Sequence, residues 1–228
     1  MPVVSGSSGR GVASSLAPLM GMQYIELESR RFPDGEGYVR VPTEAIDAVR
    51  SEPVVLVSNT YPDSGIVSTL LLLEAIADVR RGDLSNLKGE EPQSMDDVGG
   101  GVFLAIPYYG YSRQDKRFSK GEAISARVIA EILARGCDGI AILDLHEPAV
   151  LEGMDVPIEF VSSMPEIAEL LQSEVSPDFV LSPDKGAISR ATEVAGLIGC
   201  DFSYLAQTRI DAHTIEHLAL THTRRCRR

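Results

Sequence analysis

The chain has 228 residues, 44% of them hydrophobic and 24% charged, which suits one large or two small soluble domains with buried cores. Its net charge of −12 argues against non-specific binding to nucleic acid or to anionic membranes, because both partners attract basic surfaces. No apolar run approaches membrane-spanning length, the N-terminus lacks the features of a signal peptide, and the three cysteines lack C-x-x-C spacing, so we expect a cytoplasmic protein without a disulfide framework or zinc site.

Strand-like and helix-like segments alternate along the chain, which is typical of a doubly wound parallel sheet. Strands are predicted first at 3–4, 24–28, 37–41, 54–58, 102–106 and 140–143. Helices are predicted up to Met20, over 66–79 with a cap at Asp63-Ser64, and over 123–133 with Gly136 at the C′ position. A second alternation places strands at 158–161, 179–181 and 202–205 and helices at 165–173 and 187–198. We therefore predict two similar α/β layers, an N-terminal domain over 1–147 and a C-terminal domain over 148–228.

Two connecting segments are chiefly structural in this prediction. The Gly/Ser turn over 5–11 could cradle phosphate, but it lacks the Lys-Ser/Thr ending of a Walker motif, so a plain tight turn is favoured. The segment 81–101 is polar, acidic and rich in glycine and has no periodicity, so we expect a disordered surface insertion there.

The segment 107–127 lies between a predicted strand and a predicted helix and gathers tyrosines and cations. Its five basic residues are Arg113, Lys116, Arg117, Lys120 and Arg127. A local positive patch on an acidic protein favours a small polyanion such as a nucleotide over a duplex. Arg113 can neutralise phosphate and Gln114 can donate to a ribose or a base, although a solvated surface with ion pairs to Asp115 or Glu122 is the alternative.

Three further segments carry candidate ligand-binding side chains. In the turn over 31–36, Phe32 could stack on a purine while Asp34 or Glu36 accepts from its amine, yet Pro-Asp-Gly is equally a common structural turn. Asp144 and His146, two residues apart, would share one face at the carboxyl end of a strand, and the default for such a histidine is a buried, hydrogen-bonded side chain. Asp184 follows a later strand at the equivalent place, where its alternative role is an N-cap.

In order and spacing, the segments 30–36, 107–127, 144–146 and 182–187 together resemble the ribose-phosphate diphosphokinase (PRPP synthetase) family. The resemblance implies an α/β fold of two similar doubly wound parallel-sheet (phosphoribosyltransferase-like) domains, the second incomplete. It assigns ATP binding to Asp34, Gly35 and Glu36, often at a neighbouring subunit's site, which implies a homo-oligomer. It also assigns ATP binding to Arg113 and Gln114, and Mg²⁺ binding to His146 and Asp184.

The same resemblance implies the reaction. A diphosphoryl group would pass from Mg-ATP to the anomeric hydroxyl of ribose 5-phosphate, giving PRPP and AMP. Residues 204–211 align with the family's flexible catalytic loop, in which Arg209 matches an arginine that holds phosphate charge on substrate and transition state. Gln207 stands where the family carries a lysine, so a cation is missing there.

The sequence after 214 departs from the family pattern. It contains neither the paired aspartates nor the Thr-Gly-Gly-Thr-like turn that binds the sugar phosphate, and we expect a truncation or a reading-frame error. The alternative is a catalytically impaired family member that binds nucleotide and assembles with active subunits. A phosphoribosyltransferase of related fold ranks lowest, because it would need the same missing turn.

Overall fold

The computed structural model describes residues 1–82, 84, 100–209 and 215–221, and from residue 206 onward it describes the backbone alone. The chain divides into two compact units, Met1–Val161 (unit 1) and Ser162–Arg228 (unit 2), and each is described by itself. Of the helices in these ranges, none combines the length and apolar character needed to cross a bilayer. The segment expected to be an insertion, 81–101, falls mainly on residues outside the described ranges.

Unit 1 is built on a six-stranded sheet with the order β2-β1-β5-β6-β7-β8, and all of its neighbouring strands are parallel. Its strands are β1 (Val3–Ser5), β2 (Tyr24–Glu26), β5 (Val54–Val57), β6 (Val102–Ile106), β7 (Gly139–Leu143) and β8 (Ile158–Val161). The strand order reverses between β1 and β5. This is the arrangement of a doubly wound sheet, so the predicted fold class is confirmed.

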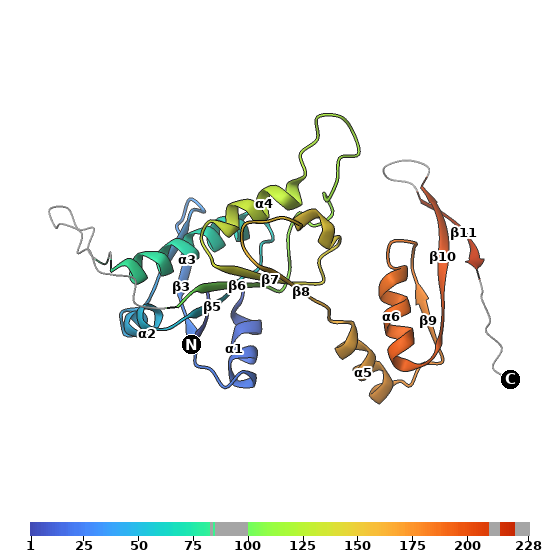
Figure 1. Cartoon of the computed structure of the whole chain (residues 1–228), viewed down its shortest axis with the longest axis horizontal. Coiled ribbons are helices and arrows are strands. Elements are labelled where there is room, and N and C mark those ends of the chain that lie inside the picture. Colours follow the sequence, from blue (N-terminus) through green and yellow to red (C-terminus); the bar gives the residue numbers. More distant parts are fainter. Residues whose placement is uncertain (83, 85–99, 210–214, 222–228) are drawn as a thin grey trace. The chain divides into compact units, whose positions relative to one another are not determined.

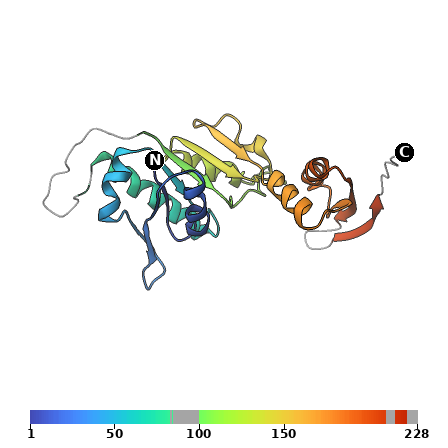
Figure 2. The ribbon, with the colours of Figure 1, turned by 90° about the horizontal axis from the view of Figure 1, so that it is seen from below.

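Helices cover the two faces of this sheet unequally (Figure 1). They are α1 (Arg10–Leu19), α2 (Ile46–Ser51) after the 3₁₀ turn η1 (Thr43–Ala45), α3 (Asp63–Arg81) and α4 (Ser125–Ala134), with the 3₁₀ turn η2 (Pro148–Leu151) after β7. Helices α3 and α4 lie on one face and α1 on the other. Figure 2, seen from the side of α1, shows β6 to β8 beside α1 with no described helix of unit 1 in front of them.

The core follows this asymmetry. Leu56, Leu104 and Ile142 are fully buried in one cluster with residues of α3 and α4. Along β6 the burial alternates, so Leu104 faces the core while Phe103 on the opposite face is 42% exposed. The central strands are therefore apolar on both faces although, within unit 1, helices bury mainly one of them.

The segment predicted as one strand over 24–28 is two strands. β2 ends at Glu26, and β3 (Glu28–Arg31) pairs antiparallel with β4 (Gly37–Arg40) in a separate two-stranded hairpin. Leu27 between them is buried, and its N–H donates to the carbonyl of Ser5. This residue holds the chain to the sheet at the point where the hairpin leaves it.

Helix ends follow the sequence signals in part. The predicted cap at Asp63-Ser64 is wrong, since Asp63 is the first residue of α3 and Pro62 occupies the N-cap. At the other end Gly82 has a φ of 76°, a left-handed conformation that favours glycine. Gly136 follows the C-cap of α4 as predicted, and a Cβ there would lie 3.1 Å from the Cβ of Leu73, so packing against α3 also demands a small residue.

The two units separate after β8, whereas the sequence analysis begins its second domain at residue 148. β8 pairs in parallel register with β7, from Ile140 opposite Ile158 to Leu143 opposite Val161. The strand that we had grouped with the second alternation is therefore the last strand of the first sheet. Hydrogen bonding between strands, which residue patterns do not record, decides its membership.

Unit 2 contains α5 (Met164–Glu174), β9 (Phe179–Ser182), α6 (Ile188–Ile198), β10 (Asp201–Arg209) and β11 (Ile215–Thr221). Its described strands form a sheet with the order β11-β10-β9, in which β9 and β10 are parallel and β11 is antiparallel to β10. The resemblance predicts a flexible catalytic loop over 204–211. In the structure, its residues up to Arg209 instead continue β10 and pair with β11.

We predict that Leu104→Ala, in the middle of β6, lowers the free energy of unfolding by about 2–5 kcal/mol, because the substitution leaves a cavity in the core. The measurement is urea unfolding followed by circular dichroism. Val67→Ala, on the exposed side of α3, is the control and should change stability by less than about 0.5 kcal/mol. Equal losses in the two variants would contradict the assignment of Leu104 to the core.

Candidate functional site

The segment that follows β6 is folded onto the carboxyl ends of the sheet. Tyr109 is buried, and its hydroxyl donates to the carbonyl of Ala126 over 2.6 Å. Burial raises the pKa of the Tyr109 phenol, so it remains a neutral donor at physiological pH. Tyr111, with a φ of 64°, donates its hydroxyl to Asp63 over 2.8 Å. The second and third tyrosines of this segment are thus tied to α4 and α3.

The cations of this segment have different surroundings. The side chain of Arg113 is exposed and forms no hydrogen bond or ion pair with any described residue. The Nε of Arg117 donates to the carbonyl of Glu122 over 2.8 Å, and Nζ of Lys116 lies 5.6 Å from the centre of the Phe118 ring. Arg113 therefore presents an uncompensated charge to solvent.

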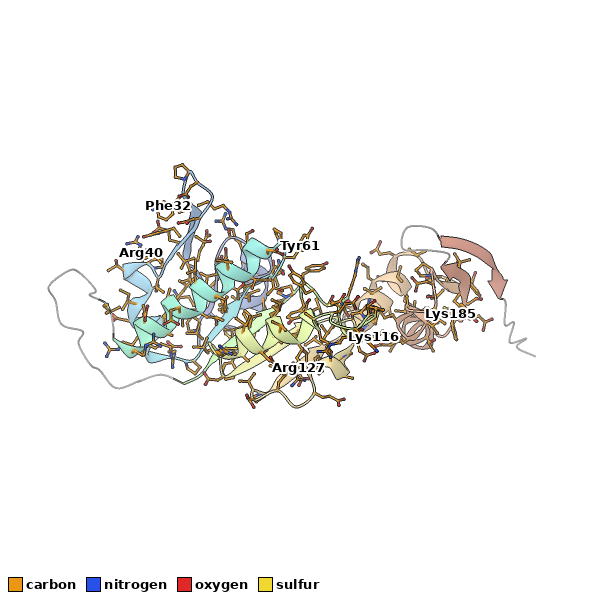
Figure 3. All side chains as sticks on the ribbon, turned by 90° about the horizontal axis from the view of Figure 1, so that it is seen from above. Phe32, Arg40, Tyr61, Lys116, Arg127 and Lys185 are labelled. Atoms are coloured by element: carbon orange, nitrogen blue, oxygen red, sulfur yellow. The ribbon has the colours of Figure 1, made fainter. Side chains whose placement is uncertain are left out.

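The predicted cluster of five cations is wrong at one position. Arg127 is on α4, where its Nε pairs with Glu131 at 2.8 Å and its Nη1 donates to the carbonyl of Glu152 at 3.1 Å. Figure 3 shows Arg127 on the helix and Lys116 in the loop before it. The helix period directs Arg127 to its neighbour four residues on, so it stabilises α4 and the end of η2.

Glu122 organises the loop between β6 and α4. Its Oε2 accepts from the backbone N–H groups of Phe118 at 2.6 Å and Ser119 at 3.0 Å. The bonds from Ser119 and Phe118 lower the pKa of the Glu122 carboxyl below 4.5. Gln114 donates through Nε2 to the carbonyl of Lys116 at 3.1 Å, so its donor group already has an acceptor in the loop.

The loop and the end of β7 meet at Asp115 and His146. Nδ1 of His146 lies 3.1 Å from Oδ2 of Asp115, whose side chain is only 7% exposed, while the His146 side chain is 54% exposed. The expectation of a buried histidine is therefore wrong. The expectation that Asp144 and His146 share one face of a strand is also wrong, because β7 ends at Leu143 and Asp144 has a φ of 50°. The sequence marked Asp115 only as a possible partner of Arg113.

This contact leaves one ring nitrogen of His146 available. A carboxylate at Nδ1 favours the tautomer that carries its proton there, and Nε2 then has a lone pair for a ligand. Among the described residues, no group of three or more His, Cys, Asp or Glu side chains is arranged to hold a metal. Mg²⁺ prefers oxygen ligands, so an imidazole is an unusual ligand for it. Because waters and phosphate oxygens complete most of its coordination, His146 suits a single contact to a metal that arrives with a nucleotide.

The β3–β4 hairpin carries Phe32 at its end (Figure 3). The guanidinium carbon of Arg30 lies 5.0 Å from the centre of the Phe32 ring and 4.1 Å from that of Tyr38. Arg30 and Tyr38 are opposite each other in the ladder, a pairing that only the hairpin register reveals. Phe32 remains 40% exposed, so part of its ring is open to a ligand.

The turn at the end of this hairpin is held by its own polar groups. Oδ1 of Asp34 accepts from the N–H of Glu36 at 3.1 Å, and Gly35 has a φ of 96°. The structural role considered for the Pro-Asp-Gly turn is therefore present, and the side chains of Asp34 and Glu36 are both exposed.

The candidate residues of unit 2 follow β9 and lie in β10. Oδ1 of Asp184 accepts from the N–H of Ala187 at 3.0 Å, but the N-cap of α6 is Ala187, so the N-cap prediction for Asp184 is wrong. For Gln207 and Arg209 the description covers only the backbone, which is opposite His217 and Ile215 in the hairpin.

Comparisons with known proteins point in one direction. Residues 100–136 match the N-terminal domain of ribose phosphate pyrophosphokinase. The chain is 36% identical to the ribose-phosphate pyrophosphokinase of Methanothermobacter thermautotrophicus, over 94% of this chain and 68% of the relative. It is 33% identical to that of Methanobrevibacter smithii, over 94% of this chain and 65% of the relative. The chain thus spans about two thirds of the length of the curated relatives it matches.

A solved structure has the same fold. The crystal structure of phosphoribosylpyrophosphate synthetase from Mycobacterium smegmatis superposes with a TM-score of 0.72 at 21% identity, covering 95% of this chain and 66% of that one. At this identity the likeness concerns the fold alone.

We predict that acidification releases the loop between β6 and α4. The pKa of Glu122 in the folded chain lies below its unfolded value of 4.5, so its contribution to loop order is present above that pH and is lost as pH falls through the folded pKa. Hydrogen exchange at the amides of Phe118 and Ser119, corrected for intrinsic rates, should accelerate below pH 4.5.

In Glu122→Gln the same amides should exchange faster already at pH 7, and the step below pH 4.5 should vanish. Glu131→Gln, which removes the partner of Arg127 on α4, serves as the matched control and should leave both amides unchanged. An unaltered pH profile in Glu122→Gln would contradict the assignment.

Proposed function

This chain belongs to the ribose-phosphate pyrophosphokinase family, and from that premise we propose that it transfers the diphosphoryl group of ATP to ribose 5-phosphate. In this reaction the anomeric hydroxyl oxygen forms a bond to the β-phosphorus of ATP, the bond from that phosphorus to the oxygen bridging to the α-phosphate breaks, and AMP leaves. The hydroxyl proton is released to solvent, and the products are PRPP and AMP.

The contact between Asp115 and His146 is the observation that carries this proposal. It joins the segment containing Arg113 to the carboxyl end of β7, which is where ligands bind in doubly wound sheets. A cation for phosphate and an imidazole with a free Nε2 are thus held on adjoining strand ends of unit 1. A metal–nucleotide complex needs both groups, a cation to neutralise its phosphates and a ligand for its metal.

Arg113 is proposed to hold the phosphates of ATP. Its guanidinium has no described partner, so a phosphate would not have to displace an existing ion pair. Charge neutralisation and positioning account for most of the catalysis in phosphoryl transfer. Gln114 is proposed to contact the nucleotide through its amide oxygen, because Nε2 already donates within the loop.

His146 is proposed to hold the magnesium that accompanies ATP, with Asp115 orienting its ring. When bound, the metal neutralises charge on the phosphate oxygens. A magnesium ligand is also proposed at Asp184 of unit 2, on the family resemblance alone.

The hairpin residues are proposed to bind the base. Phe32 offers a partly exposed ring for stacking, and Asp34, Gly35 and Glu36 form the turn beside it. The resemblance places this turn against the ATP of a neighbouring subunit, so we propose a homo-oligomer.

Arg209 is proposed to hold phosphate charge during the reaction, and Gln207 occupies the position of the family's lysine. That neutral residue favours a second candidate function, a subunit that binds nucleotide with little turnover and assembles with active subunits. An amide donates hydrogen bonds but supplies no charge to the transition state.

One experiment separates the two functions. The full chain is titrated with Mg-ATP in a calorimeter, and AMP release is measured with ribose 5-phosphate present. Binding with AMP release supports the diphosphokinase, and binding without it supports the non-catalytic subunit. No heat with a folded sample would refute both.

We predict that Asp115→Asn weakens Mg-ATP binding by about 10- to 100-fold, the usual effect of removing a carboxylate that orients a metal-binding histidine. An amide presents either an acceptor or a donor to Nδ1, so it no longer selects one tautomer. Binding of ATP without Mg²⁺ should change little, and the ¹⁵N shifts of His146 should move toward those of mixed tautomers. Asp47→Asn on α2, where the side chain is exposed, is the control. Unchanged ¹⁵N shifts would contradict this role of Asp115.

A further inference from the structure

We infer that Asn59 and Thr60, two residues that follow β5, are positioning residues for the segment that carries Arg113 and Asp115. The inference extends the proposed function, because that segment is proposed to bind the nucleotide. Neither residue belongs to a segment that the sequence analysis selected as a candidate site. Asn59 and Thr60 act on the site through hydrogen bonds to the backbone of residues 108–110.

Asn59 bridges two strand ends. Its Nδ2 donates to the carbonyl of Ser8, in the turn after β1, over 2.8 Å. Its Oδ1 accepts from the N–H of Tyr108, just after β6, over 2.9 Å. One amide side chain therefore joins the segments that leave β1, β5 and β6, at the point where the strand order of the sheet reverses.

Thr60 holds the next turn of the same segment. Its Oγ1 accepts from the N–H of Gly110 over 2.7 Å, and its own N–H donates to the carbonyl of Tyr108 over 3.1 Å. Thr60 is only 1% exposed. Because a buried N–H without a partner costs free energy, the hydroxyl of Thr60 constrains where Gly110 lies.

The fit between these residues leaves little room for movement. A Cβ on Gly110 would lie 2.3 Å from the carbonyl oxygen of Thr60, so the two backbones are in direct contact. The neighbouring Ser58 is fully buried, and its hydroxyl lies 2.8 Å from Oγ1 of Thr69 on α3 and 3.2 Å from Oγ of Ser8. The anchor is therefore supported from α3 and from the turn after β1.

This anchor is connected to the ligand-binding end of the segment. Beyond Gly110, Tyr111 is tied to Asp63, and its carbonyl accepts from the N–H of Gln114 over 3.0 Å. Asp115 follows directly and contacts His146. A shift of residues 108–110 would therefore move the carboxylate that orients the imidazole, although Asn59 and Thr60 touch neither.

The test compares Thr60→Val, which removes the hydroxyl at nearly constant shape, with Thr60→Ser, which keeps it. Thr60→Val should accelerate hydrogen exchange at the Gly110 amide by about fivefold to tenfold, the equivalent of one hydrogen bond. The ¹⁵N shifts of His146 should change, and Mg-ATP should bind about fivefold more weakly, while the KM for ribose 5-phosphate stays the same. Thr60→Ser should remain within about twofold of the unaltered chain in every readout.

Asn59→Asp is a second variant of unchanged size, in which the acceptor for Tyr108 remains and the donor to Ser8 is lost. Repulsion between the new carboxylate and the carbonyl of Ser8 should displace the side chain, so exchange at Tyr108 should accelerate and the ¹⁵N shifts of His146 should change in the same direction as in Thr60→Val. Unchanged His146 shifts in both variants, despite faster exchange at Gly110 or Tyr108, would overturn the inference, since the anchor would then be purely local. If the unaltered chain binds no Mg-ATP, the proposed function fails, but the exchange and ¹⁵N readouts still decide the positioning role.

Discussion

The candidate site of unit 1 depends on one polar contact, the pair formed by Asp115 and His146. A carboxylate that is 7% exposed needs a partner, because burying an unpaired charge costs several kcal/mol. His146 supplies that partner while more than half of its own side chain remains in solvent. The aspartate is therefore fixed by burial, and the imidazole is fixed through its contact with the aspartate.

The parallel sheet makes this contact possible. Adjacent parallel strands end at the same edge, so residues that follow β6 and β7 are brought together although they are 31 positions apart in the chain. The residues after β5 and β1 reach the same edge, where Asn59 and the Ser8 turn fill the point of strand reversal with side-chain hydrogen bonds. In this chain, hydrogen bonds within the protein fill the point between β1 and β5 where the strand order reverses. The groups proposed to bind ligand, on Arg113 and His146, follow β6 and β7, which lie one and two strands further along the sheet.

The sequence was informative where a pattern repeats locally and uninformative where distant segments must pair. Alternation of strands and helices predicted the doubly wound sheet, which the structure confirms, whereas anion binding by the cations after β6 stays a prediction. The β3–β4 hairpin, the membership of β8 and the partner of Asp115 depend on register between strands, which composition and periodicity do not encode. Arg127 was misassigned because nearness in sequence counted for more than its position on a helix, where the residue four positions ahead is the nearer partner.

The surroundings of Arg113 suit the phosphate contact that we propose for it. In a chain with a net charge of −12, carboxylates are plentiful, and Arg10, Arg40 and Arg81 each pair with one or two of them. Such exposed pairs contribute little to stability, but they neutralise the cation locally. Arg113 lies in the same acidic protein and has no described carboxylate partner, because nearby acids serve other groups: Asp115 contacts His146, and Glu122 accepts backbone N–H groups. An exposed cation whose neighbouring carboxylates contact other groups keeps its attraction for an incoming phosphate. The contacts of Asp115 and Glu122 therefore connect the fold of this segment to the phosphate binding proposed for Arg113.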